Sequence, residues 1–124
     1  MDFQITVTSF GFKYAAPPES DLMFDVRFLP NPFYVEELKP LCGLDAPVRD
    51  YLFSHDVSNE FLTKLVDMVD FIIPYFAAKG RTELRVAVGC TGGRHRSVAV
   101  AAALAAHLQQ EGQRVELLHR DVSR

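Results

Sequence analysis

The stretch Gly89-Cys90-Thr91-Gly92-Gly93-Arg94-His95-Arg96-Ser97 decides the fold. It follows an apolar run, 84–88, that predicts a buried strand, and it precedes a run of Ala, Leu and Val, 98–108, that predicts a buried helix. A strand, a glycine-rich turn and a helix form an arrangement that binds anions, because the first amides of the helix are unpaired and lie at the positive end of its dipole. We therefore expect a phosphate group to bind at this turn.

The side chains of the turn support the same expectation. The two glycines allow a tight turn and a close approach to a ligand. Arginine side chains add positive charge, and a serine hydroxyl and the backbone amides of 91–95 add donors, while the cysteine lines the pocket as a candidate reactive thiolate. The ligand-binding residues expected here are Cys90, Thr91, Gly92, Gly93, Arg94, His95, Arg96 and Ser97.

Length and composition indicate one ordinary globular domain. The chain has 124 residues, of which 48% are hydrophobic and 23% charged, which is enough for one domain with a real core. No apolar stretch approaches the length of a bilayer span, and the N-terminus lacks the layout of a secretion signal. We expect a cytoplasmic protein without membrane contact. Cys42 and Cys90 are expected to be reduced thiols, and neither has a second cysteine nearby to share a metal, so no metal site is predicted.

The charge is unevenly distributed along the chain. From Lys79 onward eight Lys or Arg accompany four Asp or Glu, whereas the first 78 residues carry five and twelve. The basic part contains the glycine turn. Such an asymmetry attracts an acidic ligand or a nucleic acid, and it is equally compatible with solvated surfaces that bind nothing.

The first half of the chain predicts two strands and a long irregular segment. Alternation over 3–8 predicts the first strand, and an aromatic-rich loop containing Lys13 follows at 9–14. A second strand is predicted over 22–29, from which Asp25 and Arg27 leave on the same face, either paired with each other or in a polar pocket. Prolines 30 and 32 end that strand. The segment from there to residue 47 is long for a connection, which suggests a lid or a partner surface.

The second half predicts two long helices and two more strands. A short helical piece at 48–53 precedes a helix that Ser58 is expected to cap and Pro74 to bend or end. The turn Lys79-Gly80-Arg81 stops this helix, and a fourth strand is predicted at 115–118. The order β, β, α, β, α, β predicts an α/β domain with a mostly parallel sheet of about four strands flanked by helices.

This order brings distant polar residues to one edge of the sheet. Ligands of parallel α/β sheets bind beyond the carboxyl ends of the strands, where 9–13, 27–31, 90–97 and 119–120 would meet. His55 and His107 look incidental. The secondary ligand candidates, for the sugar end of a phosphorylated ligand, are Asp25, Arg27, Asn31, Lys13 and His119.

Several long motifs resemble one family over nearly the whole chain: Ser9-Phe10-Gly11-Phe12-Lys13-Tyr14, Phe24-Asp25-Val26-Arg27-Phe28-Leu29-Pro30-Asn31-Pro32, Gly43-Leu44-Asp45, the glycine turn with Val88, and His119-Arg120-Asp121. They resemble the C-terminal domain of the RapZ family, also called YvcJ, of nucleotide-binding proteins and RNase adapters. The resemblance implies a Rossmann-like domain with a sugar phosphate or similar anion in the glycine turn. In enterobacterial members this domain senses glucosamine-6-phosphate and binds small regulatory RNAs, which it delivers to an endoribonuclease. We also expect a homo-oligomer. The RNA-binding candidates are Arg114, Arg120 and Arg124.

The chain departs from the family pattern at three points. The Gly-x4-Gly-Lys-Ser/Thr motif of the family's N-terminal P-loop NTPase domain does not occur in these 124 residues, so we expect either an excised domain or a stand-alone relative. Phe33 stands where the enterobacterial members have a histidine after Asn-Pro, which affects the amino-sugar end of the site. The chain stops at Arg124 without their basic tail, and we expect weaker RNA binding in consequence.

The same turn also fits a catalytic hypothesis. Cys90-x5-Arg96-Ser97 matches the signature of cysteine-dependent phosphatases, in which a thiolate at a helix N-terminus attacks a phosphoryl group that an arginine holds. Gly89 replaces the histidine that precedes the nucleophile in those enzymes. The only acidic candidates for a proton donor are Asp25, Asp45 and Asp56. We therefore predict a non-catalytic regulatory domain without a cofactor and keep the phosphatase as the alternative.

Overall fold

The computed structural model describes residues 3–124 and contains a four-stranded parallel sheet. The strands are β1 (Gln4–Gly11), β2 (Leu22–Asp25), β3 (Glu83–Cys90) and β4 (Arg114–His119), in the order β2-β3-β1-β4. β1 pairs with β3 and with β4, and β2 pairs with β3, always in parallel. The prediction of an α/β domain with a parallel sheet is therefore confirmed.

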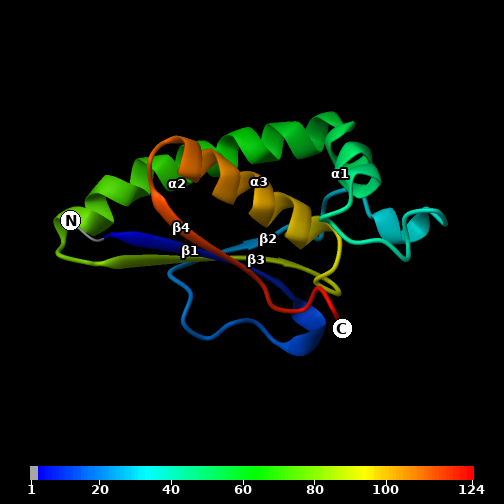
Figure 1. Ribbon diagram of the computed structural model, residues 1–124, viewed down its shortest axis with the longest axis horizontal. Helices are drawn as coiled ribbons and strands as arrows, with labels where there is room; N and C mark the ends of the chain where they lie inside the picture. The colour runs from blue at the N-terminus through cyan, green and yellow to red at the C-terminus, as the bar shows by residue number, and fades with distance from the viewer. Residues whose placement is uncertain (1–2) are drawn as a thin grey trace.

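Three α-helices pack on one face of this sheet (Figure 1). They are α1 (Ala46–Phe53), α2 (Asp56–Ala78) and α3 (Arg96–Gln110); two short 3-10 helices, η1 (Phe12–Tyr14) and η2 (Pro32–Tyr34), follow β1 and β2. The helices thus flank the sheet on one side, while the segment that leads from η1 to β2 crosses below it. Within residues 3–124, no helix combines the length and the apolar character that crossing a membrane requires.

The register of the strands explains which face the helices cover. Ile5 and Val7 of β1 lie beside Leu84 and Val86 of β3, and all four are buried in one core with the inner faces of α2 and α3. Side chains alternate between the two faces of a strand, so this apolar row can only point to the helix side. Because the strands are parallel, their carboxyl ends all lie at one edge of the sheet.

The two N-terminal strands differ from their predicted lengths. β1 continues to Gly11, through residues that the aromatic loop was predicted to contain, because Phe10 is fully buried and packs against Phe12 at a centroid distance of 4.8 Å. β2 ends at Asp25 instead of at residue 29. The amide of Val26 still donates to Gly89 (2.8 Å), but the amide of Leu29 then donates back to Val26, which closes a turn.

The predicted cap of α2 was wrong, and of the two effects expected of Pro74, a bend or an end of the helix, the end does not occur. The residue that precedes the helix is His55, whereas Ser58 lies inside the first turn with a buried hydroxyl that has no partner within residues 3–124. Pro74 does not end the helix, which continues to Ala78. Pro74 lies on the solvent side, where a carbonyl that loses its amide partner can be hydrated, while buried Ile73 holds the same turn to the core.

Candidate anion-binding site

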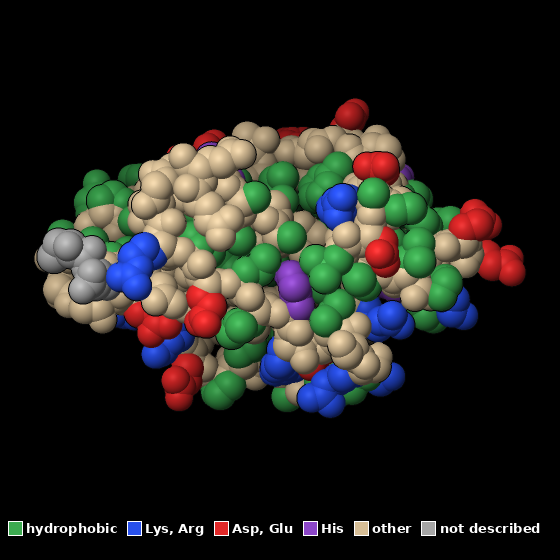
Figure 2. All heavy atoms as spheres, viewed as in Figure 1, with side chains coloured by type: hydrophobic (Ala, Val, Ile, Leu, Met, Phe, Trp, Pro, Cys, Tyr) green, Lys and Arg blue, Asp and Glu red, His purple; other side chains and the backbone are tan. Residues whose placement is uncertain are grey.

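A cavity of about 390 Å³ lies at the edge of the sheet where the strands end. Its size lies within the range of small-molecule sites. Five basic side chains line it and no Asp or Glu of residues 3–124 does, and Figure 2 shows Lys and Arg gathering on this end of the molecule. The lining residues are Lys13, Tyr14, Asn31, Phe33, Tyr34, Lys39, Cys90, Thr91, Gly92, Arg94, His95, Arg96 and Arg124.

The loop between β3 and α3 presents its amides to this cavity without using them. Within the described part of the chain, no hydrogen bond has an amide of 91–95 as its donor. Three carbonyl groups of the same loop are occupied. Thr91 accepts from the amide of Lys13 (3.1 Å), Arg94 from the amide of Gly43 (2.7 Å) and His95 from the amide of Ala99 (3.1 Å). No side chain caps the start of α3. Unpaired amides at the start of a fifteen-residue helix attract an anion.

Gly93 and Gly11 allow two loops to touch through their backbones. Gly93 has a φ of +79°, and a Cβ there would lie 2.6 Å from the amide nitrogen of Gly11 and 2.8 Å from the Cβ of Asp121. A Cβ on Gly11 would in turn lie 2.5 Å from the carbonyl carbon of Gly92. Gly92 itself has open space where a Cβ would stand, because it faces the cavity. The two neighbouring glycines therefore have different roles.

The Arg96 guanidinium is buried, and only one of its edges is bonded firmly. Nη1 donates to the carbonyls of Arg27 (2.6 Å) and Leu29 (3.2 Å), and these two hydrogen bonds hold the segment that follows β2. Nη2 makes one long contact with the Thr91 hydroxyl (3.4 Å), and Nε has no partner within residues 3–124. The edge formed by Nε and Nη2 is the edge with which an arginine binds two oxygens of a phosphate.

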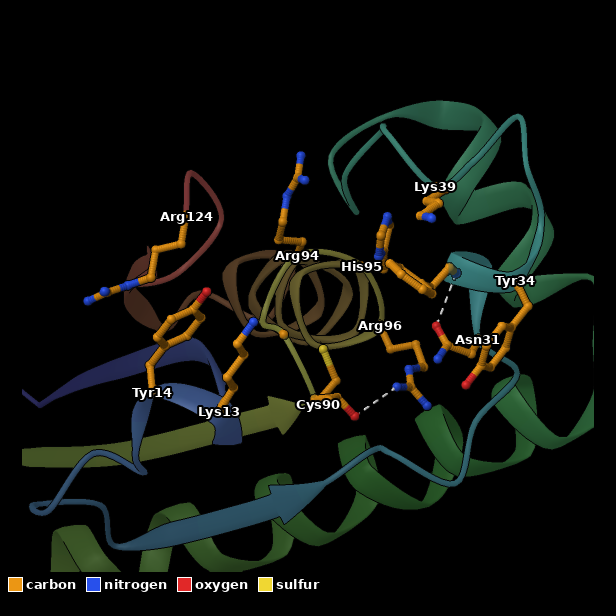
Figure 3. A pocket seen from close by; sticks show the side chains of 13 residues that line it. Lys13, Tyr14, Asn31, Tyr34, Lys39, Cys90, Arg94, His95, Arg96 and Arg124 are labelled. Atoms are coloured by element: carbon orange, nitrogen blue, oxygen red, sulfur yellow. Dashed lines mark hydrogen bonds between the residues drawn. The ribbon is translucent and has the colours of Figure 1, made fainter.

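Arg94 and His95 are placed differently from Arg96, although all three line the cavity. Arg94 extends away from the loop, and its Nη2 lies 3.4 Å from the carbonyl of Pro40 (Figure 3). Burial lowers the pKa of His95, an effect that the nearby carbonyl of Leu41 only partly opposes, so the ring is neutral at pH 7. Lys13 instead reaches toward the loop from η1 (Figure 3).

Cys90 and Ser97 lie together beneath the loop. Both are buried, and the Cys90 Sγ is 3.1 Å from the Ser97 Oγ. Cys90 lines the cavity, whereas Ser97 and Gly93 do not. Ser97 is thus placed to contact the thiol, and its expected role as a direct donor to the anion stays a prediction.

The C-terminal segment, which follows β4, binds the end of β1 next to the loop. The fully buried carboxylate of Asp121 accepts from the amide of Gly11 (2.8 Å) and from the side chains of Arg120 and Arg124 (each 2.8 Å). Burial alone would raise the pKa of Asp121, but these donors together hold it below its usual value. Arg124 also stacks on Tyr14, 4.5 Å from the ring centroid, and so enters the cavity wall.

Several of the predicted secondary residues lie outside the cavity. Asp25 and Arg27 pair with each other (2.6 Å), and this bond lowers the pKa of Asp25. His119, the last residue of β4, lies beside β1, and its Nδ1 is 2.7 Å from the Ser9 hydroxyl. Burial lowers the pKa of His119. Arg114 begins β4, at the opposite end of that strand from Arg120. Of the secondary ligand candidates, Lys13 and Asn31 line the cavity.

Sequence reasoning missed part of the cavity wall. Tyr14, Tyr34 and Lys39 line it, and Tyr34 is 82% exposed on η2. Figure 3 shows Asn31 and Tyr34 beside Arg96. The available signal was the long irregular segment from 30 to 47, which suggested a lid or a partner surface without identifying its inward-facing residues.

A family model and several known proteins match this chain. A family model described as the RapZ C-terminal domain matches residues 3–123. A nucleotide-binding protein of Finegoldia magna is 56% identical over 117 residues, which are 94% of this chain and 41% of that protein. Proteins of the same name from Clostridium botulinum and Carboxydothermus hydrogenoformans are 54% identical over 119 residues and 49% identical over 120, covering 96% and 97% of this chain. The chain spans about two fifths of the length of these relatives (41%, 40% and 42%).

Proposed function

Because the chain belongs to the RapZ C-terminal domain family, we propose that it is a regulatory domain that binds a phosphorylated small molecule in the loop 91–95 without transforming it. The relatives are named nucleotide-binding proteins. The finer ligand class that we propose is a sugar phosphate, of which glucosamine-6-phosphate is the first to test.

The observation that carries this proposal is the Nε of Arg96. It is a buried, charged donor without a partner within residues 3–124, at the base of a loop whose amides are also unbonded. Burying a charged donor without an acceptor is unfavourable, so such a group indicates an absent acceptor. The oxygens of one bound phosphate can accept from Nε, Nη2 and several of the loop amides together.

The remainder of the cavity supports a small, hydroxylated ligand. Lys13 and Lys39 supply charge that favours a doubly charged phosphomonoester, and Asn31 and Tyr34 offer polar groups beside Arg96. Phe33, which replaces the histidine of the enterobacterial members, gives this wall an apolar part. We therefore propose that the sugar is held by hydroxyl contacts to Asn31 and Tyr34 and that the amino group contributes little.

Calorimetric titration tests this assignment. We expect glucosamine-6-phosphate to bind and unphosphorylated glucosamine to bind at least tenfold more weakly, a difference of about 1.4 kcal/mol. The informative variant is Arg96→Lys, which keeps a charge but lacks the two-donor edge. It should lose most of the affinity. Because Arg96 also bonds the carbonyls of Arg27 and Leu29, circular dichroism is needed to establish that the variant used for binding is folded. Arg85→Ala, at the other end of β3, is the matched control. Equal binding of the two sugars, or full affinity in Arg96→Lys, would remove the phosphate assignment.

The adapter role is proposed from the family resemblance and from the basic end of the molecule. Lys13, Lys39 and Arg94 lie exposed or half-buried around the cavity, where they can contact RNA phosphates. A gel shift with a small structured RNA should show retention that falls steeply as salt is raised. Retention that does not depend on salt, or none at low salt, would leave this domain with a metabolite-binding role alone. Whether an endoribonuclease is the partner is tested by co-purification in the presence of that RNA.

The phosphatase alternative rests on the 3.1 Å contact between Cys90 Sγ and Ser97 Oγ, which is suited to stabilising a thiolate. Against hydrolysis, none of Asp25, Asp45 and Asp56 lines the cavity, so none of these three carboxyl groups is placed to protonate a leaving group. p-Nitrophenyl phosphate tests the thiol by itself, because its leaving group needs no proton, and a domain that binds without catalysis should give no turnover of it. Turnover that disappears in Cys90→Ser would establish the catalytic function instead.

A further inference from the structure

Three metal-ligating side chains meet where α2 packs on α3, at the end of α3 far from the anion loop. Asp70 comes from α2, and His107 comes from the last turn of α3, with Glu111 immediately after the helix. The Nε2 of His107 lies 3.0 Å from an oxygen of Asp70 and 3.1 Å from an oxygen of Glu111. All three side chains are about one third exposed, so an ion from solvent reaches them.

The cluster contains more acceptors than its own donor satisfies. A single hydrogen on Nε2 can point at one oxygen, yet two carboxylate oxygens lie within hydrogen-bond distance of that nitrogen. Within residues 3–124, no Lys or Arg forms an ion pair with Asp70 or Glu111. At neutral pH the group therefore carries two negative charges against at most one positive charge.

The spacing of the ligand atoms suits a divalent cation. The three atoms all lie within 4.8 Å of one another, and two of the separations are close to 3 Å. In a tetrahedral zinc site with bonds of about 2.0 Å, neighbouring ligand atoms are about 3.3 Å apart. A small outward movement of exposed side chains is all that separates the observed arrangement from such a site.

We propose that Asp70, His107 and Glu111 bind a divalent transition-metal ion of the Zn²⁺ type and that this ion ties α2 to α3. The imidazole selects Zn²⁺, Co²⁺ or Ni²⁺ over Mg²⁺ and Ca²⁺, which prefer sites built from oxygen alone. Water completes the coordination on the exposed side. The site is independent of the anion loop, so the two proposals succeed or fail separately.

The alternative account is an ion pair in which protonated His107 bridges both carboxylates. Titration of the metal-free protein with Zn²⁺ at neutral pH distinguishes the two. We expect one equivalent to bind with micromolar or tighter affinity, and we expect the melting temperature to rise with Zn²⁺ but not with Mg²⁺. Co²⁺ should give the intense visible absorption of a tetrahedral or five-coordinate ion.

Conservative variants locate the ion. His107→Gln and Glu111→Gln should each weaken Zn²⁺ binding at least about tenfold while remaining folded. His55→Gln and Cys42→Ser, which remove other ligand types from the surface, should leave the affinity unchanged. Binding weaker than millimolar, or binding that survives His107→Gln and Glu111→Gln, would overturn the proposal and leave the ion pair as the explanation.

Discussion

The floor and the rim of the cavity are built in different ways. The floor consists of the buried residues Gly11, Gly93, Arg96 and Asp121, which contact one another or a neighbouring backbone. Of these, only Arg96 lines the cavity itself, and the other three support the strand end and the loop next to it. The rim consists of Lys13, Tyr34 and Lys39, which are exposed. We therefore expect floor residues to support both the fold and the proposed site, whereas rim residues should contribute to ligand binding alone. This difference predicts which substitutions unfold the protein and which only weaken binding.

The largest effect is expected at Asp121. Asp121→Ala leaves the amide of Gly11 and the Arg120 guanidinium without their buried acceptor, and it should lower the free energy of unfolding by about 3 kcal/mol. Urea denaturation followed by circular dichroism measures the loss. Arg124→Ala, which removes one exposed donor to the same carboxylate, is the control and should lose much less.

The same carboxylate gives the stability a pH dependence. Because the pKa of Asp121 is lower in the folded chain than in the unfolded chain, its contribution is complete above about pH 4, the unfolded value. It is lost as the pH falls through the folded value. Asp121→Asn should therefore lose less stability than the wild type on acidification below pH 4. Identical acid profiles would show that the ionised form is not stabilised by the fold.

The next largest effect is a difference in stability between alanine substitutions at the two adjacent glycines. Gly93→Ala should destabilise the domain by about 2 kcal/mol, because alanine is strained at positive φ and its Cβ meets the Gly11 backbone. Gly92→Ala should leave the melting temperature within a degree or so, since a Cβ there meets nothing. Thermal unfolding of the two variants side by side decides the matter. Equal destabilisation would mean that loop and β1 do not stack as described.

Gly92→Ala should nevertheless bind ligand poorly. Its methyl group would project into the cavity beside the loop amides, and we expect the affinity for a phosphorylated sugar to fall about tenfold, which is about 1.4 kcal/mol. Calorimetry of this stable variant measures binding without a folding defect. Retained affinity would indicate that the phosphate lies away from the loop.

The smallest effects are expected on the rim. Lys13→Ala and Lys39→Ala should each reduce affinity only a few-fold, by less than about 1 kcal/mol, since exposed charges are screened by solvent. These losses should shrink as salt is added, whereas that of Gly92→Ala should not. Lys64→Ala on α2 is the matched control. A rim substitution that destabilises the fold would contradict the expectation that rim residues contribute to binding alone.

The sequence predicted those parts of the molecule whose residues follow one another along the chain. Strand, glycine turn and helix follow one another from 84 to 108, so periodicity and the glycines were sufficient to predict them, and the structure confirms the parallel α/β sheet and the comparisons the family. The expected anion ligands stay predictions. The sequence pattern missed the hydrogen bonds between residues that are far apart along the chain. Nothing near Arg96 in sequence indicates that its Nη1 binds the carbonyl of Arg27, and nothing near Asp121 indicates Gly11 as its partner.

Local propensity also misjudged where elements end. The second strand was extended to 29 because its residues are apolar, but the turn closed by Leu29 and Val26 outweighs that preference. Pro74 was expected to disturb α2, and the burial of Ile73 in the same turn offsets the missing bond. The contacts that no short window contains are those of Arg96 with the carbonyls of Arg27 and Leu29 in the first case and the burial of Ile73 in the second.

The contact between Gly11 and Gly93 is made by backbone atoms alone, and we expect it to fix the depth of the cavity. Gly11 and Gly93 pack backbone against backbone there, and the Asp121 carboxylate, which accepts from the amide of Gly11, holds the contact in place. Ligand preference can consequently be redesigned at positions 13, 34 and 39 while the oxyanion cradle is inherited unchanged. A library confined to those three positions would vary what is recognised without disturbing how the phosphate is held.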